Sequence, residues 1–283
     1  MRPGMVVVHA LRPDGAVIIQ RVETLKFAHC VAVVPDNRFV YVCHVAPSSA
    51  TAILAFDLAT GSLTLSSWFS SGDVRHLAFH PEDERVMYGN DQFGVSLRVP
   101  RVDPLRGGLK ERQAVTTLPA NHVRTRDTGQ SCSTATVRVH HSGRVVLVTN
   151  RGDNSLSCFP LAADGTVSGA AQRIPTGPRP RVLAVMNDDD LIFTGSDNGT
   201  AVSIFRLHLP PSLDGAEQDP GDRARTQESD DSRAYMPRPN AEQPENEGLP
   251  LIERVGEIEV GGPVGWLSDL PDASAHVRTS SSL

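Results

Sequence analysis

HCVAVVPDNRFVYV, residues 29–42, recurs three more times along the chain without gaps. The other copies are RHLAFHPEDERVMY (75–88), ATVRVHHSGRVVLV (135–148) and RVLAVMNDDDLIFT (181–194). Each copy is an apolar segment, a tight polar turn and a second apolar segment, which predicts two short antiparallel strands. Successive turns are 46, 60 and 46 residues apart, counted between Pro35, Pro81, His141 and Asn187. A period of about 46 residues is typical of β-propellers, in which each repeat forms one blade.

A third and a fourth strand are predicted after most of these pairs. Third strands are expected at 52–58, 155–161 and 201–207, which are alternating or wholly apolar. Turns that contain Gly61 and Gly165 then lead to short fourth strands at 62–65 and 166–169. The sequence therefore predicts an all-β fold, a β-propeller of four-stranded antiparallel blades. The long period leaves room for an inserted loop between about Asp103 and Thr128.

The two ends of the chain fit the repeat only in part. Residues 5–20 match a third and a fourth strand, whereas residues 262–267 resemble a first strand that would close the ring. Residues 208–250 are polar and poor in large apolar side chains, which predicts a disordered insertion before a last fourth strand at 251–258. We therefore divide the chain into propeller blades at 1–207, the insertion at 208–250, the last propeller strands at 251–272 and a flexible tail at 273–283.

Composition excludes several classes of function. The formal net charge is −6 and no basic stripe is present, so no nucleic-acid partner is expected. The apolar runs are far shorter than the roughly 20 residues that span a bilayer, so no membrane span is expected. The N-terminus lacks a signal-peptide pattern, which favours a cytoplasmic location. The four cysteines show no CxxC spacing, which favours buried reduced thiols over a metal cluster or disulfides. No cofactor is expected, and no feature indicates an oligomeric state.

Several short motifs resemble blade signatures of the lactonase family, seven-bladed propellers that include 6-phosphogluconolactonases and carboxymuconate cyclases. These motifs are Phe79-His80-Pro81, the segments 35–42 and 149–156, and Gly262-Pro263. The resemblance covers nearly the whole chain apart from 208–250, and it implies seven blades. About five blade-equivalents are present here, and residue 1 aligns inside the third blade. Two N-terminal blades are therefore expected to be absent, either through truncation of the gene or because the ring has fewer blades.

Candidate site residues come first from the repeat itself. Six residues before the four turns lie His29, Arg75, Ala135 and Arg181. This position is at the entry of the strands that line a propeller channel, and three of its four occupants are polar or cationic among apolar neighbours. We therefore expect those three side chains to converge near the propeller axis, provided that the strand register is as aligned.

The resemblance implies a functional role for the same positions. In the carboxymuconate cyclase branch a His, two Arg and a Glu surround the channel, and they correspond here to His29, Arg75, Arg181 and Asp91. Asp91 is one methylene shorter than the family's Glu. Structural roles are the alternative: a satisfied buried histidine, ion pairs between blades, and turn chemistry at Asp91. His76 flanks Arg75 on the same strand and is expected to contact a neighbouring blade.

Three functions are compatible with this set. The leading prediction is hydrolysis of a small anionic lactone such as 6-phosphogluconolactone, in which His29 or Asp91 activates water and Arg75 and Arg181 bind negative charge. A carboxymuconate-type cycloisomerase, which forms a lactone from a dicarboxylate, would use the same groups.

The third alternative is a non-catalytic propeller that acts as a binding or scaffold protein. It is favoured by the third repeat, where Thr136 and Arg138 stand in place of the acidic residue and the His that many family members have. The shorter Asp91 and the expected absence of two blades point in the same direction.

Overall fold

A computed structural model describes residues 3–70, 72–119, 132–186, 190–209, 251–260 and 262. Every helix or strand within these ranges is a β-strand, so the all-β prediction is confirmed. Among these residues no helix has the length and hydropathy of a membrane span.

Four sheets are four-stranded and antiparallel, and each uses its strands in chain order, as propeller blades do. The first blade consists of β3 (Ala28–Val33), β4 (Phe39–His44), β5 (Ala50–Asp57) and β6 (Ser62–Phe69). The second consists of β7 (Val74–Phe79), β8 (Met87–Asp91), β9 (Ser96–Val102) and β10 (Leu109–Thr116). The third consists of β11 (Ser133–Val139), β12 (Val145–Arg151), β13 (Ser155–Pro160) and β14 (Gln172–Pro175). The fourth consists of β15 (Pro180–Val185), β16 (Leu191–Ser196), β17 (Ala201–His208) and β18 (Leu251–Glu259).

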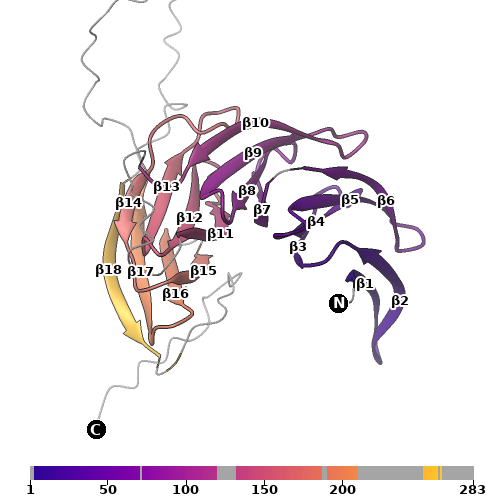
Figure 1. The fold of residues 1–283 in the computed structure, drawn as a ribbon, viewed down its shortest axis with the longest axis horizontal. Helices are drawn as coiled ribbons and strands as arrows, with labels where there is room; N and C mark the ends of the chain where they lie inside the picture. The colour runs from indigo at the N-terminus through magenta and orange to yellow at the C-terminus, as the bar shows by residue number, and fades with distance from the viewer. Residues whose placement is uncertain are drawn as a thin grey trace, which may run out of the picture.

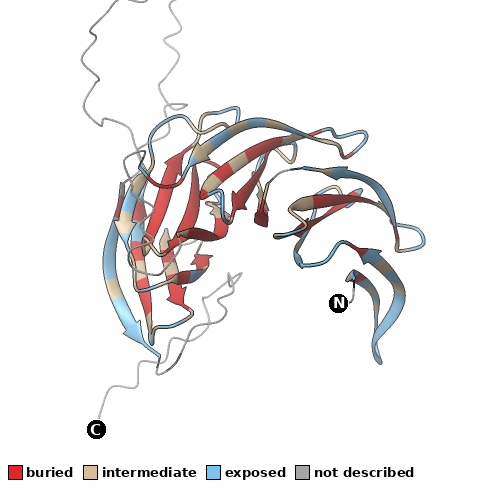
Figure 2. Ribbon diagram, viewed as in Figure 1, coloured by how far each residue is buried: buried red, intermediate tan, exposed pale blue. Residues whose placement is uncertain are grey.

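A two-stranded sheet precedes these blades, formed by β1 (Gly4–Arg12) and β2 (Gly15–Thr24). The sheets follow one another around an arc, with β3, β7, β11 and β15 along its inner side (Figure 1). The first strand of every complete blade is thus innermost, as the repeat predicts. Buried residues concentrate in the inner and middle strands, whereas β2, β6 and β18 are mostly exposed (Figure 2).

The hydrophobic cores lie between neighbouring sheets. One core joins β1 and β2 to the first blade around Val6 and Leu54, and a second joins the first and second blades around Tyr41 and Met87. The other two join the second to the third blade and the third to the fourth. Each blade therefore buries its faces against its neighbours, because a single blade has no core of its own.

A repeated tyrosine contact joins successive blades. The hydroxyl of Tyr41 on β4 donates to the carbonyl of Gly107 at 2.8 Å, and the hydroxyl of Tyr88 on β8 donates to the carbonyl of Gly165 at 2.7 Å. Both glycines have positive φ, 68° and 77°, in the turn between the third and fourth strands of the next blade. A Cβ at Gly107 would lie 2.4 Å from the ring of Phe39, so glycine is required there by space as well as by backbone conformation.

Two strand predictions were wrong. The loop expected at 103–128 contains β10, whose alternating side chains pair with β9. The fourth strand of the third blade is β14 rather than 166–169, where Val167 makes only an isolated bridge to Leu161. The small side chains of 169–171 offer little to pack, and pairing resumes where Ile174 reaches the core.

Three further predictions lie outside the described residues. They are the disorder of the insertion beyond residue 209, the closing strand from 263 onward and the flexible tail at 273–283. The four cysteines are free: Cys43 and Cys158 are buried, and Cys30 and Cys132 are half-buried.

Candidate functional site

The first strand of each blade carries a β-bulge at the position that the repeat selects. The pairing register shifts around His29 in the first blade and around Arg181 in the fourth. The second and third blades have the same irregularity around Arg75 and Ala135. A bulge re-aims the side chain of the extra residue and is common next to functional sites. The same kind of bulge on all four inner strands therefore sets the orientation of the side chains at this repeat position.

The bulge of the second blade holds two side chains against the third blade. The guanidinium of Arg75 donates to the carbonyl of Ala135, and Nδ1 of His76 lies 2.8 Å from the same oxygen. The third blade repeats the connection, since the hydroxyl of Thr136 donates to the carbonyl of Arg181 at 2.7 Å. Thr136, a departure from the family pattern, thus anchors the strand that carries Arg181.

His29 and His76 form a pair of neutral imidazoles. Their rings are edge-on, with centroids 4.9 Å apart and planes at 79°. Although His29 is exposed, partial desolvation of its ring and the charges of Arg75, Arg181 and Arg151 lower its pKa to about 4. Burial, Arg75 and His29 lower the pKa of His76 to about 3. Both rings are therefore unprotonated at pH 7 and can act as bases.

Two more arginines, which the repeat does not select, lie beside them. Arg151 ends β12, is 8% exposed and donates to the carbonyl of Thr134 at 3.3 Å. Arg179 precedes β15 and has a left-handed backbone with φ 46°. It pairs with Asp197 at 3.1 Å, and Arg181 lies 3.5 Å from the other oxygen of the same carboxylate. The name channel cluster is used below for His29, Arg75, His76, Arg151, Arg179, Arg181 and Asp197.

The channel cluster is strongly cationic, with four guanidiniums and one carboxylate. Burial, then the charges of Arg151 and Arg181, lowers the pKa of Arg75 to about 10. Burial, then the charge of Arg179, lowers the pKa of Arg151. An anion would relieve this mutual repulsion. Guanidinium groups bind phosphate and carboxylate oxygens in pairs, so the cluster is suited to a small phosphorylated or carboxylated ligand.

Asp91 has different partners. It is 3% exposed at the end of β8, and its carboxylate lies 2.9 Å from the guanidinium of Arg98 on β9. Arg98 in turn lies 2.8 Å from Glu111 on β10. The structure therefore brings three of the four predicted residues together and holds Asp91 in an ion-pair chain across the second blade. Asp197 is the carboxylate that contacts the arginines of the cluster.

Sequence reasoning missed Arg151, Arg179 and Asp197 as members of the site. Arg151 lies in the motif Asn150-Arg151-Gly152, part of the segment 149–156, which the sequence favours as a structural turn. Arg179 and Asp197 occupy no repeat position, and only the folded loops on either side of β15 and β16 bring them to Arg181.

The family is decided by a sequence profile. The profile described as Lactonase, 7-bladed beta-propeller matches residues 20–210. The chain belongs to this lactonase family. The propeller fold and the resemblance inferred from the blade signatures are thereby confirmed.

Curated relatives of this lactonase-family chain include 6-phosphogluconolactonases. One from Pectobacterium carotovorum subsp. carotovorum (strain PC1) is 26% identical over 196 residues, which are 67% of this chain and 56% of that protein. One from Yersinia enterocolitica serotype O:8 / biotype 1B is 22% identical over 195 residues, which are 67% of this chain and 56% of that protein. The chain thus spans little more than half the length of these relatives.

Solved structures give the same fold. The periplasmic gluconolactonase PpgL of Pseudomonas aeruginosa has a TM-score of 0.61 at 20% identity and covers 73% of this chain, which covers 60% of PpgL. A protein from Lactobacillus plantarum has a TM-score of 0.63 at 20% identity, with 71% and 60% coverage. At these identities the likeness concerns the fold alone.

Proposed function

We propose that this chain hydrolyses a phosphorylated sugar lactone, 6-phosphogluconolactone, at the channel cluster. The observation that carries the proposal is the set of guanidiniums around an unprotonated imidazole. Partial desolvation, then the charges of Arg75, Arg181 and Arg151, lower the pKa of His29. The family membership and the names of the curated relatives support the same substrate class.

His29 is the proposed base. As a neutral imidazole it takes a proton from a water molecule, whose oxygen then attacks the lactone carbonyl carbon. The negative charge that develops on the carbonyl oxygen is stabilised by Arg75 and Arg181, which are already held in place by the bulged strands. The ring C–O bond then breaks, the ring oxygen takes the proton that His29 removed from water, and the new carboxylic acid loses its proton to solvent and leaves as a carboxylate.

The other arginines bind the phosphate in this proposal. Arg151 has a buried Nε without a hydrogen-bond partner among the described residues, so part of its donor capacity is unused within them. Arg179 holds Asp197 and thereby limits how far that carboxylate neutralises Arg181. Phosphate oxygens would be bound by paired guanidinium N–H groups.

The cyclisation alternative is less well supported. A cycloisomerase needs a proton donor, and the two imidazoles of the cluster are unprotonated at pH 7 because their pKa values are lowered to about 4 and about 3. No observation favours it over hydrolysis. A cytoplasmic location stays a prediction, because one structural neighbour is named as a periplasmic gluconolactonase.

The test is a pH-stat assay of acid release from 6-phosphogluconolactone, corrected for spontaneous opening. We expect turnover by the chain. In Arg181→Met we expect kcat/KM to be lower by about 10- to 100-fold, which corresponds to the free energy of one hydrogen bond to a charged group. Arg112→Met is the matched control, because Arg112 is also an exposed arginine paired with one aspartate, Asp164, at 3.1 Å.

The outcomes separate the alternatives. Acid release no faster than the spontaneous rate, with 6-phosphogluconate still bound at the cluster, would favour a non-catalytic binding protein. An equal loss of kcat/KM in Arg181→Met and Arg112→Met would remove the assignment of the site.

A further inference from the structure

A second group of chemically active side chains lies at the other end of the inner strands. His140 and His141 follow β11, and Asp190 precedes β16. One donor atom from each of the three lies within 4.8 Å of the others. The channel cluster takes His29, Arg75 and Arg181 from the beginning of β3, β7 and β15, whereas these residues are in the turns after β11 and β15. The group is therefore separate from the proposed lactonase site.

His140 is the fixed member of the group. Its side chain is fully buried, and its Nδ1 lies 2.9 Å from the hydroxyl of Ser142. Its Nε2 lies 3.1 Å from a carboxylate oxygen of Asp190. The ring of His141 is exposed, with its centroid 4.0 Å from that of His140. A buried imidazole nitrogen is thus aimed at a carboxylate and placed beside a second imidazole.

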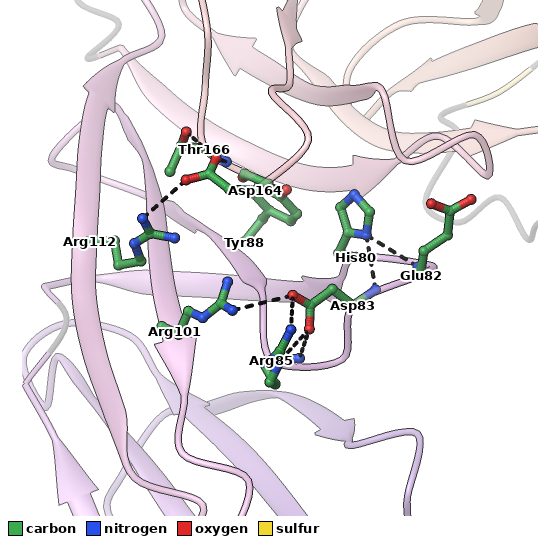
Figure 3. Close-up of polar contacts among 10 residues, drawn as sticks. His80, Glu82, Asp83, Arg85, Tyr88, Arg101, Arg112, Asp164 and Thr166 are labelled. Carbon is green, nitrogen blue, oxygen red and sulfur yellow. Dashed lines mark hydrogen bonds and ion pairs between the residues drawn. The ribbon is translucent and has the colours of Figure 1, made fainter. Parts of the chain in front are cut away.

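The second blade provides an internal comparison, because His80 occupies the same repeat position as His140. Nδ1 of His80 accepts hydrogen bonds from the backbone amides of Glu82 and Asp83, at 3.2 and 3.1 Å (Figure 3). Its Nε2 lies 3.0 Å from the carbonyl of Gly143 in the third blade. Both ring nitrogens of His80 therefore have hydrogen-bond partners, and the side chain connects the second blade to the third.

His140 differs from His80 in the partner of its Nε2 atom. Its Nε2 has no carbonyl partner among the described residues and faces a carboxylate and a second histidine instead. Two imidazoles and a carboxylate that come together in this way are the donor set of a transition-metal site.

We propose that His140, His141 and Asp190 bind a divalent transition-metal ion of the Zn²⁺ class, with water as the fourth ligand. Tetrahedral donors about 2.0–2.1 Å from zinc lie about 3.4 Å apart, closer than the 4.8 Å limit here. The exposed side chain of His141 and the half-buried side chain of Asp190 would reach that spacing by rotation, while His140 stays in place. Nδ1 of His140 lies 2.9 Å from the hydroxyl of Ser142 and accepts from the backbone amide of Ser142 at 3.3 Å, and these contacts fix the orientation of the ring.

The ion would fasten two blades. His140 and His141 belong to the third blade and Asp190 to the fourth, so the metal replaces at this position the backbone contact that His80 makes between the second and third blades. Because binding to the folded state raises its stability by mass action, the ion should increase the melting temperature.

The test uses the full chain without a polyhistidine tag, stripped with a chelator and titrated calorimetrically with Zn²⁺. We expect one bound ion per chain and a raised Tm. His141→Asn and Asp190→Asn should each weaken binding by at least about 10-fold, since loss of even an outer partner of a ligand costs that much. His208→Asn is the control, because His208 is an exposed histidine 2.9 Å from Glu253 in the same fourth blade.

Co²⁺ serves as the second probe. We expect the d–d absorption of a four-coordinate ion without a sulfur charge-transfer band, and the same loss in the two variants. The proposal is overturned if Zn²⁺ does not bind stoichiometrically, if both variants bind it as tightly as the parent chain, or if Co²⁺ shows thiolate ligation. An equal loss in His208→Asn would overturn it as well.

Discussion

His29 is unprotonated at pH 7 because partial desolvation and three guanidiniums lower its pKa to about 4, although the residue is exposed. If it is the base, kcat/KM should be flat above about pH 5 and fall at lower pH, with an inflection near 4, as the ring becomes protonated. Arg181→Met removes one of the charges that lower this pKa, so His29 should titrate at a higher pH in that variant. An NMR pH titration of the histidine rings measures both values.

Arg112→Met is again the control, since Arg112 is not among the groups that shift the pKa of His29. It should leave the titration unchanged. A His29 ring that titrates near its ordinary value of about 6.5 in the parent chain would show that the guanidiniums do not surround it.

The repeat selected three members of the site because equivalent register places His29, Arg75 and Arg181 on equivalent inner strands. It could not show that each sits in a bulge, because a bulge is a property of pairing and not of one strand. Asp91 was carried over from the resemblance alone, and the ion pair with Arg98 that occupies it has no signature in the sequence.

At the level of the strands, the two tyrosine contacts between blades should contribute equally to stability. Tyr88→Phe leaves the carbonyl of Gly165 without its 2.7 Å partner, and Tyr41→Phe does the same to Gly107 at 2.8 Å. We expect each change to lower the free energy of unfolding by about 1–3 kcal/mol, the cost of an unsatisfied buried polar group. Urea denaturation with an unchanged m-value measures this.

Leu58→Ala is the control for that experiment, because Leu58 is 67% exposed and should change stability by less than roughly 0.5 kcal/mol. Tyrosine variants as stable as this control would mean that the hydroxyls add nothing beyond the packing of the rings.

The strands that could be predicted are those with apolar periodicity on both sides of a turn. The first and second strands of all four blades follow from the repeat, since their buried side chains must alternate or run continuously. β10 and β14 could not be placed in this way. β10 is outermost and half-exposed along its length, and β14 has four residues, so both contribute little apolar pattern.

For the molecule as a whole, the arc of blades places a cationic cluster on the inner strands of a chain whose net charge is −6. The overall charge repels anions, so an anionic substrate must be held by local contacts at the channel cluster. Attraction between exposed charges weakens as salt is added, whereas contacts with buried groups such as Arg75, 4% exposed, weaken less.

The most direct test of the central claim is a calorimetric titration of the chain with 6-phosphogluconate, the product of the proposed reaction, at low and high ionic strength. We predict one site per chain, an affinity that falls as salt rises, and a further loss of about 10-fold or more in Arg181→Met but not in Arg112→Met. The claim that the channel cluster is an anion-binding active site would be contradicted by an affinity that changes neither with salt nor in Arg181→Met. The absence of binding at low salt would contradict it as well.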